Sequence, residues 1–266
     1  MTSSDVRRWR QSVTIPDLTD DAVHVWLIPL DASQPIVDVL RSRLSSDELE
    51  RAERFVFPRH RSRFIVGRAC LRVLLGGYTG ESPEDLQFQY GPHGKPELIA
   101  ESGEGRVRFN LAHSKNTALL AVTLDRAIGI DIEHWRAMHD GRDIATRFFA
   151  PAEIEQLNAL PAAQWEDGFF ACWTRKEAYI KARGEGLAIP LNEFAITTQP
   201  DNQIAILQSQ IDPSDRERWS VRELHVAPKC PGAVVVEGTG WSLRLLRLPD
   251  WPERTADLPQ IIQRSL

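Results

Sequence analysis

Three carboxylates and two lysines stand in two short segments whose spacing could support chemistry on a phosphate. Asp131 and Glu133 belong to the segment GIDIE and lie two residues apart. In a strand, such positions share one face, so the two carboxylates repel each other unless a cation or protons neutralise them. A surface edge strand with two solvated acids is the alternative. The flanking Ile128, Ile130 and Ile132 weaken it, because they indicate one firmly buried side.

The second segment, WTRKEAYIKARGEGL at 173–187, has the pattern of a helix that ends at a glycine. Glu177 and Lys181 are four residues apart and face one side, whereas Lys176 is turned about a quarter of the circumference away. Taken alone, this spacing fits an exposed ion pair. If the helix packs beside GIDIE, however, Glu177 becomes a third carboxylate, and three oxygen ligands with open water positions suit Mg²⁺ bound to phosphate.

Other candidates are ambiguous singly. His113 in FNLAHS lies just beyond a strand pattern and, with the following serine and lysine, could donate to an anion. Lys95 in GPHGKP is an ordinary turn lysine. Seven arginines between residues 51 and 72 form a basic block that could bind a small polyanion or simply lie on a solvated helix face.

These residues must be held by a mixture of helices and strands. Strand patterns are AVHVWLI (22–28), LQFQY, RVRFNL, TALLAVTL, AIGIDIE (127–133) and five C-terminal segments that alternate like antiparallel strands. Helix patterns are a segment starting near 46 with the capping-box pair Ser45 and Glu48, then 61–77 closing on paired glycines, DIATRFF, a helix opened by Pro151, and about 165–183. This order predicts an α+β architecture, with two similar halves meeting near residue 125.

Composition sets the protein class. The 266 residues, 42% of them apolar, can bury a substantial core. The net charge of −5 argues against a general nucleic-acid binder, and no segment approaches the roughly 20 apolar residues of a membrane span. We therefore expect a cytoplasmic protein without nucleic-acid or membrane partners. Cys70, Cys172 and Cys230 fit no disulfide or zinc pattern, so we expect buried thiols.

Taken together, the motifs indicate a family. The run GKP, FNLAHS, GIDIE and WTRKEAYIKARGEGL, over residues 94–187, closely resembles the Sfp-type 4′-phosphopantetheinyl transferases. The KEAxxK element with an upstream GIDIE is highly specific. The arginine-rich RAERFVFPRHRSRF, the RFF at 147–149 and the LAIPL at 187–191 are also similar, so the motifs cover roughly residues 45–195.

The resemblance implies a fold and a reaction. The fold is a pseudo-twofold α+β arrangement of two similar subdomains, with 1–125 recognising the nucleotide and 126–266 carrying the metal ligands, the catalytic helix and the carrier docking surface. The reaction is of the holo-[acyl-carrier-protein] synthase type. It moves the phosphopantetheine arm of coenzyme A onto a serine of an acyl, peptidyl or polyketide carrier protein and releases adenosine 3′,5′-bisphosphate.

The resemblance also implies roles for single residues. Asp131, Glu133 and Glu177 bind Mg²⁺, or Mn²⁺ in its place, and Asp131 also counts among the catalytic residues with Glu177 and Lys181. Glu177 is the base for the serine hydroxyl, directly or through water, and Lys181 assists the leaving phosphate. The remaining implied contacts to coenzyme A are Lys176 and Lys181 at the pyrophosphate, Arg51 and His113 at the 3′-phosphate with Arg63 nearby, and Lys95 and Pro96 at the adenine.

Departures and alternatives complete the expectations. Relatives usually have serine where this chain has Ala112, so we expect a hydroxyl donor to the 3′-phosphate to be missing, and Arg51 stands where they use lysine. We expect both changes to alter coenzyme A affinity and not the reaction. Carrier docking is expected over 134–150, with steering by Arg136, Arg142 and Arg147 and apolar contacts from Phe148 and Phe149, at least one of which we expect in the core. The alternatives are a Mg²⁺-dependent hydrolase of coenzyme A or nucleotide pyrophosphates and a non-enzymatic binding module. We expect a monomer, since both sides of the site lie in one chain.

Overall fold

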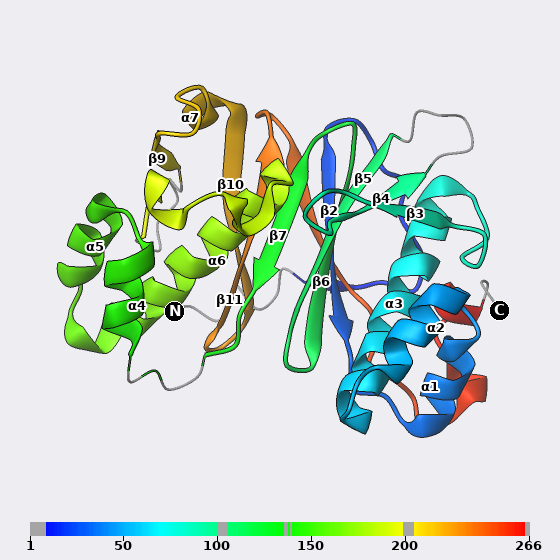
Figure 1. The fold of residues 1–266 in the computed structure, drawn as a ribbon. Helices are drawn as coiled ribbons and strands as arrows, with labels where there is room; N and C mark the ends of the chain where they lie inside the picture. The colour runs from blue at the N-terminus through cyan, green and yellow to red at the C-terminus, as the bar shows by residue number, and fades with distance from the viewer. Residues whose placement is uncertain (1–8, 100–105, 136–137, 139, 199–204, 264–266) are drawn as a thin grey trace.

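The computed structural model of the chain describes residues 9–99, 106–135, 138, 140–198 and 205–263. Within these residues, the strands form four separate sheets and helices pack against them. Helices α1 to α3 gather at one end of the molecule and α4 to α6 at the other, with the two larger sheets between them (Figure 1). The α+β class predicted from the sequence is confirmed.

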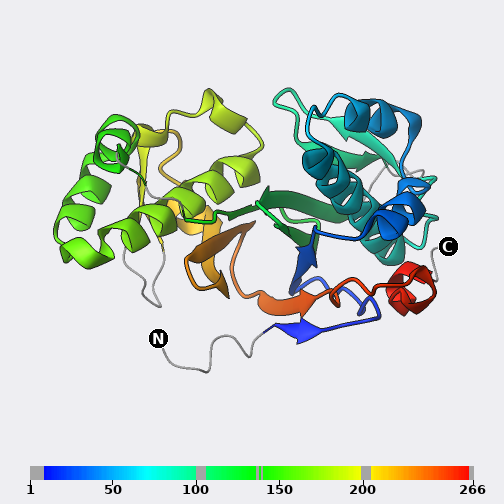
Figure 2. The ribbon, with the colours of Figure 1, turned by 90° about the horizontal axis from the view of Figure 1, so that it is seen from below.

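The largest sheet has the strand order β1-β12-β2-β6-β5. Its members are β1 (Arg10–Gln11), β12 (Ser242–Arg247), β2 (Ala22–Pro29), β6 (Thr117–Leu124) and β5 (Val107–Ser114). Strands β2, β6 and β5 are antiparallel neighbours, but β12 runs parallel to both β1 and β2. Figure 2 shows β1 and β12 side by side. The predicted antiparallel order of the C-terminal strands is therefore wrong for β12, which enters this sheet instead of pairing with the preceding strand.

Three helices build the core at this end. They are α1 (Gln34–Arg41), α2 (Ser46–Glu53) and α3 (Pro58–Thr79). The predicted start of α2 is confirmed, and the backbone N–H of Ser45 donates to Oε2 of Glu48 at 3.1 Å. Helix α1 was not predicted, although it buries three apolar side chains against α3 and the sheet.

Helix α3 extends further in both directions than the predicted 61–77. Its paired glycines do not end it. A Cβ at Gly77 would lie 1.9 Å from Cδ1 of Ile15, so the glycine permits the N-terminal segment to approach the helix. The sequence pattern could not separate this close approach from a helix stop.

The second sheet has the antiparallel order β10-β11-β7, formed by β10 (Trp219–Ala227), β11 (Cys230–Glu237) and β7 (Ile128–Ile132). Helix α6 (Trp165–Arg183) packs on this sheet, and its Ala178 and Ile180 share a buried cluster with Val235. Helices α4 (Gly141–Phe148) and α5 (Pro151–Asn158) pack near the beginning of α6 through an aromatic cluster. The predicted helices in this region are confirmed.

Smaller elements complete the described chain. They are the two-stranded sheets β3 (Gln87–Tyr90) with β4 (Pro96–Ile99) and β8 (Phe194–Ile196) with β9 (Ile206–Ser209), the helices α7 (Asp215–Arg218) and α8 (Gln260–Gln263), and short 3-10 turns at Ala162–Gln164, Gly186–Ala188, Leu191–Glu193 and Thr255–Asp257. All three cysteines are buried thiols, as expected. Over the described ranges, none of the helices has the length and apolar character that crossing a bilayer requires.

The division of the chain at residues 125 and 126 remains a prediction. The structure adds that the end of the chain returns to the first elements: β12 pairs with β2, and α8 packs against α3.

Candidate active site

Helix α6 and strand β7 meet at backbone distance, and a glycine makes this possible. A Cβ at Gly129 would lie 2.1 Å from the carbonyl oxygen of Ala178 and 2.3 Å from the nitrogen of Ala182. Because any larger residue would push the helix away, Gly129 sets the distance between the two elements. The two motifs identified in the sequence therefore meet in space, as the metal hypothesis requires.

Asp131 lies inside this contact. Its side chain is only 10% exposed, and its Oδ1 accepts a hydrogen bond from Nζ of Lys181 at 2.5 Å. Desolvation raises the pKa of Asp131, although the ammonium of Lys181 opposes the change. The alternative of a solvated edge acid is wrong for Asp131, because α6 covers it.

The carboxylate of Glu177 interacts electrostatically with those of Asp131 and Glu133. Desolvation raises the pKa of Glu177; the ammonium of Lys181 lowers it, and the negative charges of Asp131 and Glu133 raise it further. Glu133 follows the end of β7, and its Oε1 accepts a hydrogen bond from the buried Ser114 at 3.4 Å. The same serine oxygen accepts from the backbone N–H of His134 at 3.0 Å. Ser114 thus orients Glu133, a role that the sequence did not suggest.

The donor set fits Mg²⁺ chemically, since three carboxylates are hard oxygen ligands and their mutual repulsion favours a cation. They do not form a ready-made coordination sphere. Within the part of the chain that the structure describes, there is no group of three His, Cys, Asp or Glu side chains close enough to hold a metal ion. Lys181 provides the positive charge beside Asp131 in this conformation.

Lys176 does not join this group. Its side chain is fully buried, and Nζ donates at 2.7 Å to both carboxylate oxygens of Glu153 and to the carbonyl oxygen of Phe194. An ammonium has three donors, so these contacts use all of them. This position does not fit the expected pyrophosphate contact: the quarter turn that separates Lys176 from Glu177 points it into the core.

The basic block of residues 51–72 is divided by the fold. Arg68 and Arg72 are buried and pair with Glu48, so they stabilise the core. Arg63 is paired through two hydrogen bonds, of 2.6 and 2.9 Å, with Asp31. Arg51 is exposed, and its guanidinium lies over the ring of Phe64.

His113 lies next to the last residue of β5, near the carboxylates of Asp131, Glu133 and Glu177. Its side chain reaches solvent, but surrounding atoms crowd the ring on its other sides. This partial desolvation lowers the pKa of His113, and the positive charges of Lys181 and Arg63 lower it further. The structure therefore brings His113, Arg63 and Lys181 within electrostatic reach of one another, as their predicted contacts to one ligand require.

Ala112, the neighbouring residue, points the other way. It is buried in the cluster that contains Val25 and Leu119, because adjacent residues of a strand face opposite sides. A serine hydroxyl here would enter the core instead of lying beside His113. The predicted loss of a phosphate contact at this position therefore finds no support in the geometry.

Lys95 lies in the turn between β3 and β4, next to Pro96. Its Nζ donates to the carbonyl oxygen of Ile128 at 2.8 Å and to that of Lys181 at 2.7 Å. Desolvation lowers the pKa of Lys95 to about 8; the carboxylate of Glu97 opposes the change, and the guanidinium of Arg108 adds to it. Its ammonium thus contacts the two elements that carry the carboxylates.

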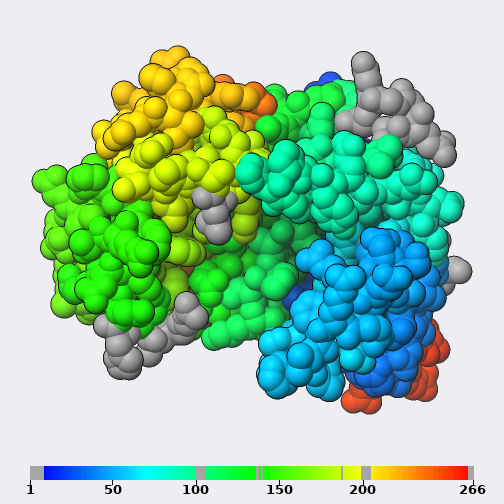
Figure 3. Space-filling view, viewed as in Figure 1, coloured from blue at the N-terminus to red at the C-terminus, as the bar shows by residue number. Residues whose placement is uncertain are grey.

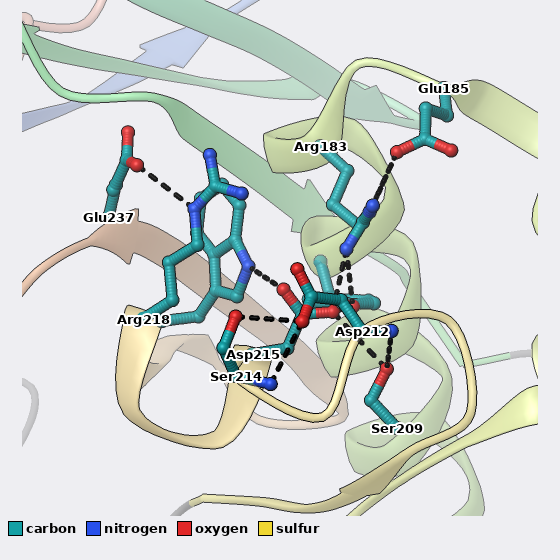
Figure 4. Close-up of polar contacts among 10 residues, drawn as sticks. Arg183, Glu185, Ser209, Asp212, Ser214, Asp215, Arg218 and Glu237 are labelled. Carbon is teal, nitrogen blue, oxygen red and sulfur yellow. Dashed lines mark hydrogen bonds and ion pairs between the residues drawn. The ribbon is translucent and has the colours of Figure 1, made fainter.

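The last turn of α6 is anchored by a buried carboxylate. Oδ2 of Asp215 accepts hydrogen bonds from Tyr179 at 2.5 Å and from Arg183 at 2.6 Å, and Oδ1 accepts from Trp219 at 2.7 Å. Figure 4 shows Arg183 between Asp215 and Glu185, which follows the helix. This network fixes the end of α6 two residues beyond Lys181.

Figure 3 shows a recess between the two groups of helices, with segments of the central strands at its floor. A ligand that enters there meets both groups of elements.

Comparisons with known proteins agree with this geometry. The sequence model of the 4′-phosphopantetheinyl transferase superfamily matches residues 127–236, and that of the N-terminal part of 4′-phosphopantetheinyl transferases matches residues 32–125. The 4′-phosphopantetheinyl transferase HetI of Nostoc sp. PCC 7120 is 46% identical over 228 residues, which cover 85% of this chain and 93% of that protein. The chain belongs to the 4′-phosphopantetheinyl transferase superfamily.

More distant members of the superfamily also align. A putative 4′-phosphopantetheinyl transferase of Synechocystis sp. PCC 6803 is 36% identical over 74% of this chain and 77% of its own length. The 4′-phosphopantetheinyl transferase Sfp of Bacillus subtilis is 30% identical over 62% of this chain and 71% of its own length. The resemblance read from the motifs is confirmed at the level of the family.

Proposed function

We propose that this chain transfers the 4′-phosphopantetheine group of coenzyme A to a serine of an apo carrier protein, in a reaction of the holo-[acyl-carrier-protein] synthase type. The observation that carries the proposal is the meeting of Asp131, Glu133, Glu177 and Lys181 at the contact of β7 with α6, in a chain of this superfamily. The products are the holo carrier and adenosine 3′,5′-bisphosphate.

The reaction is a displacement at phosphorus. The serine oxygen forms a bond to the β-phosphorus of coenzyme A, and the bond from this phosphorus to the bridging oxygen breaks. Glu177 takes the serine proton, directly or through a water molecule; a bound cation would lower the pKa of Glu177 and weaken it as a base, which makes the bridging water a real alternative. Lys181 places positive charge beside the leaving phosphate, where negative charge develops.

Asp131, Glu133 and Glu177 would hold Mg²⁺ or Mn²⁺, which neutralises pyrophosphate charge and polarises its oxygens. Their own contribution is to keep three oxygen donors on rigid elements, since Asp131 is buried by α6 and Glu133 is oriented by Ser114. Within the proposal, the dependence on a divalent cation follows from this donor set.

The nucleotide end of coenzyme A would lie against the elements of the first half. Arg51 and His113 would contact the 3′-phosphate, with Arg63 nearby, and Pro96 the adenine; the expected adenine contact of Lys95 is left out, because its ammonium donates to the carbonyl oxygens of Ile128 and Lys181. Supporting observations are the lowered pKa of His113, which desolvation causes first and the positive charges of Lys181 and Arg63 increase, and the exposed side chain of Arg51. Lys176 is omitted, because Glu153 and Phe194 occupy all three of its donors.

The carrier protein would dock over residues 134–150. Arg142 and Arg147 are exposed on α4 and could steer an acidic partner, whereas Arg136 lies outside the described residues. Phe148 is 38% exposed and is the candidate apolar contact. Phe149 is buried, which confirms that at least one of the two packs in the core.

Two finer expectations belong to the same proposal. The two groups of elements would correspond to the pseudo-twofold subdomains of the family, with the site at their junction. A monomer would suffice, because β7, α6 and the first-half residues named above lie in one chain.

The test is the intact mass of apo acyl and peptidyl carrier proteins after incubation with the enzyme, coenzyme A and Mg²⁺. A carrier that gains one phosphopantetheine group supports the transferase. Consumption of coenzyme A without any carrier adduct would support the alternative, a Mg²⁺-dependent coenzyme A or nucleotide pyrophosphate hydrolase, and would overturn the proposal.

A further inference from the structure

Among the strands that the structure describes, β7, which carries Asp131, lies at the edge of its sheet and pairs with β11 on one side only. In an antiparallel pair, the N–H and C=O groups of alternate residues point toward the partner strand. Glu237 donates to the carbonyl oxygen of Ala127, and Glu133 donates to that of Pro231, so the odd-numbered residues face β11. The backbone groups of Ile128 and Ile130 therefore point to the opposite edge.

Two side chains take the place of a strand at this second edge. The ammonium of Lys95 donates to the carbonyl oxygen of Ile128 at 2.8 Å, and Oδ1 of Asn110 accepts from the N–H of Ile130 at 2.8 Å. Asn110 belongs to β5 and is 6% exposed, so its hydrogen bond is shielded from water. Lys95 belongs to the β3–β4 turn.

Lys95 also reaches the catalytic helix. Its second hydrogen bond, of 2.7 Å, goes to the carbonyl oxygen of Lys181 in the last turn of α6. Carbonyl groups in the last turn lack partners within the helix, and a cation is favourable at this end. One ammonium thus joins β7 to α6 beside Gly129, where the two backbones touch.

We propose that Lys95 and Asn110 are positioning residues: Lys95 joins β7 to α6 and Asn110 fixes β7 against β5, so that the carboxylates of Asp131, Glu133 and Glu177 converge. In this role, Lys95 acts through backbone carbonyls and its ammonium does not recognise the adenine. The inference rests on the proposed transferase function only for its kinetic consequence, since convergence of the carboxylates can be measured without turnover.

The main variant is Lys95→Met, which keeps the aliphatic stem and removes the donors. We expect the Kd for Mn²⁺, measured by electron paramagnetic resonance in the absence of carrier protein, to rise about 10- to 100-fold, as for residues that orient metal ligands. The kcat for transfer falls at fixed low Mg²⁺ and recovers partly at high Mg²⁺, while the KM for coenzyme A changes little. A rise in the KM for coenzyme A alone, with unchanged Mn²⁺ binding, would assign Lys95 to the adenine and overturn the inference.

A second arm tests Asn110 at its own contact. In Asn110→Ala, the amide proton of Ile130 loses its acceptor, so we expect its hydrogen exchange to accelerate and the Kd for Mn²⁺ to rise. Tyr78→Phe is the matched control, because Tyr78 also takes part in two partly buried hydrogen bonds, with His24 and Trp26 of β2, and neither of them involves β7 or α6. We expect it to lower stability without changing Mn²⁺ binding. An equal effect in the control would reduce both residues to general stability.

A chemical rescue separates position from stability. Lys95→Cys treated with 2-bromoethylamine regains an ammonium at nearly the original length, and the three native thiols are buried. Recovery of Mn²⁺ binding and kcat is expected; no recovery on full alkylation contradicts the inference. If the wild-type enzyme binds Mn²⁺ but modifies no carrier, the proposed function fails while the Mn²⁺ and exchange measurements still decide the positioning role.

Discussion

Lys176 and Lys181 stand five residues apart on one helix, and each pairs with a carboxylate, yet they differ in what surrounds the pair. The Lys176 side chain has no exposed surface, and three acceptors satisfy it. The Lys181 side chain is 30% exposed; it pairs with Asp131, and its charge also acts on Glu177, which feels the charge of Glu133 as well. The first pair joins α5, α6 and β8 inside the core. The second pair, Lys181 with Asp131, leaves an excess of negative charge at a partly exposed position, where a ligand can reach it.

This difference teaches that a motif does not assign one role to all its members. The KEAxxK element supplies both lysines, but Lys176 is buried in a fully satisfied pair, whereas Lys181 is partly exposed beside Asp131. A fully satisfied buried pair contributes to the stability of the folded state, and removing one partner is costly because the other charge is left unpaired.

The largest expected effect is therefore on stability at the first pair. Lys176→Met leaves the carboxylate of Glu153 buried without its cation, and we expect the free energy of unfolding to fall by about 3 to 5 kcal/mol. Urea unfolding measures the change. The double variant Lys176→Met with Glu153→Gln removes the unpaired charge and should recover part of the loss; a double variant no more stable than the single one would contradict this account.

Lys181→Ala should affect the transfer rate more than the stability of the folded state. We expect transfer to slow by about 100- to 1000-fold, the usual effect of removing one positioned donor from developing charge. The loss of stability should be smaller than at Lys176, since the partly exposed site admits water and Asp131 can take up a proton. Comparing initial transfer rates and urea unfolding of the two variants checks the contrast, and a Lys181 variant that is merely unstable would remove it.

Gly129→Ala tests the contact that brings the second pair together. The added Cβ would push α6 from β7, and a displacement of about 1 Å at a reacting centre can cost about 100-fold in rate. Gly91→Ala is the control, because a Cβ there meets only an ordinary contact of 3.7 Å with the oxygen of Lys95. Similar transfer rates in the two variants would show that the backbone approach is unimportant.

The pH dependence of stability should report the unbalanced charge. The pKa values of Asp131 and Glu177 are higher in the folded state than in the unfolded chain. Between the ordinary carboxyl pKa and these raised values, the folded state therefore binds more protons than the unfolded chain. Metal-free protein therefore loses stability in this range, and Mg²⁺ should restore it. Thermal unfolding of wild type and Asp131→Asn checks this: the variant should lose less stability over the same interval, and identical curves would contradict the shift.

The smallest effect is expected at Ala112. Since its side chain faces the core, Ala112→Ser should change the free energy of coenzyme A binding by less than about 0.5 kcal/mol. Isothermal titration against coenzyme A and its 3′-dephospho form measures this. Clearly tighter binding of coenzyme A alone would restore a phosphate contact at this position.

The sequence predicted the α+β class, the bounds of most elements and the meeting of GIDIE with the helix that carries Glu177, because hydrophobic periodicity and motif spacing report these features. It could not place Lys176, since a lysine next to Glu177 in the sequence looks the same whether its side chain is exposed or buried. It missed Asn110 and gave Ser114 a different role, as a donor to an anion. The contacts of Asn110 with the backbone of β7, and of Ser114 with Glu133 and His134, join residues that are distant in the chain.

The parallel pairing of β12 was missed for a related reason. Alternation along a strand defines its faces but not its partner, and β12 returns to β2, more than 200 positions earlier in the sequence. Likewise, Gly77 and Gly129 are required by approaching backbone or side-chain atoms, which a single sequence does not reveal.

The most direct test of the central claim is the intact mass of one apo carrier protein incubated with coenzyme A and Mg²⁺ and either the wild type or Glu177→Gln. This substitution keeps the shape of the side chain but removes the negative charge that α6 adds to those of Asp131 and Glu133. The account predicts complete conversion to the phosphopantetheinylated carrier by the wild type and little or none by the folded variant in the same time. Equal conversion by both would contradict it.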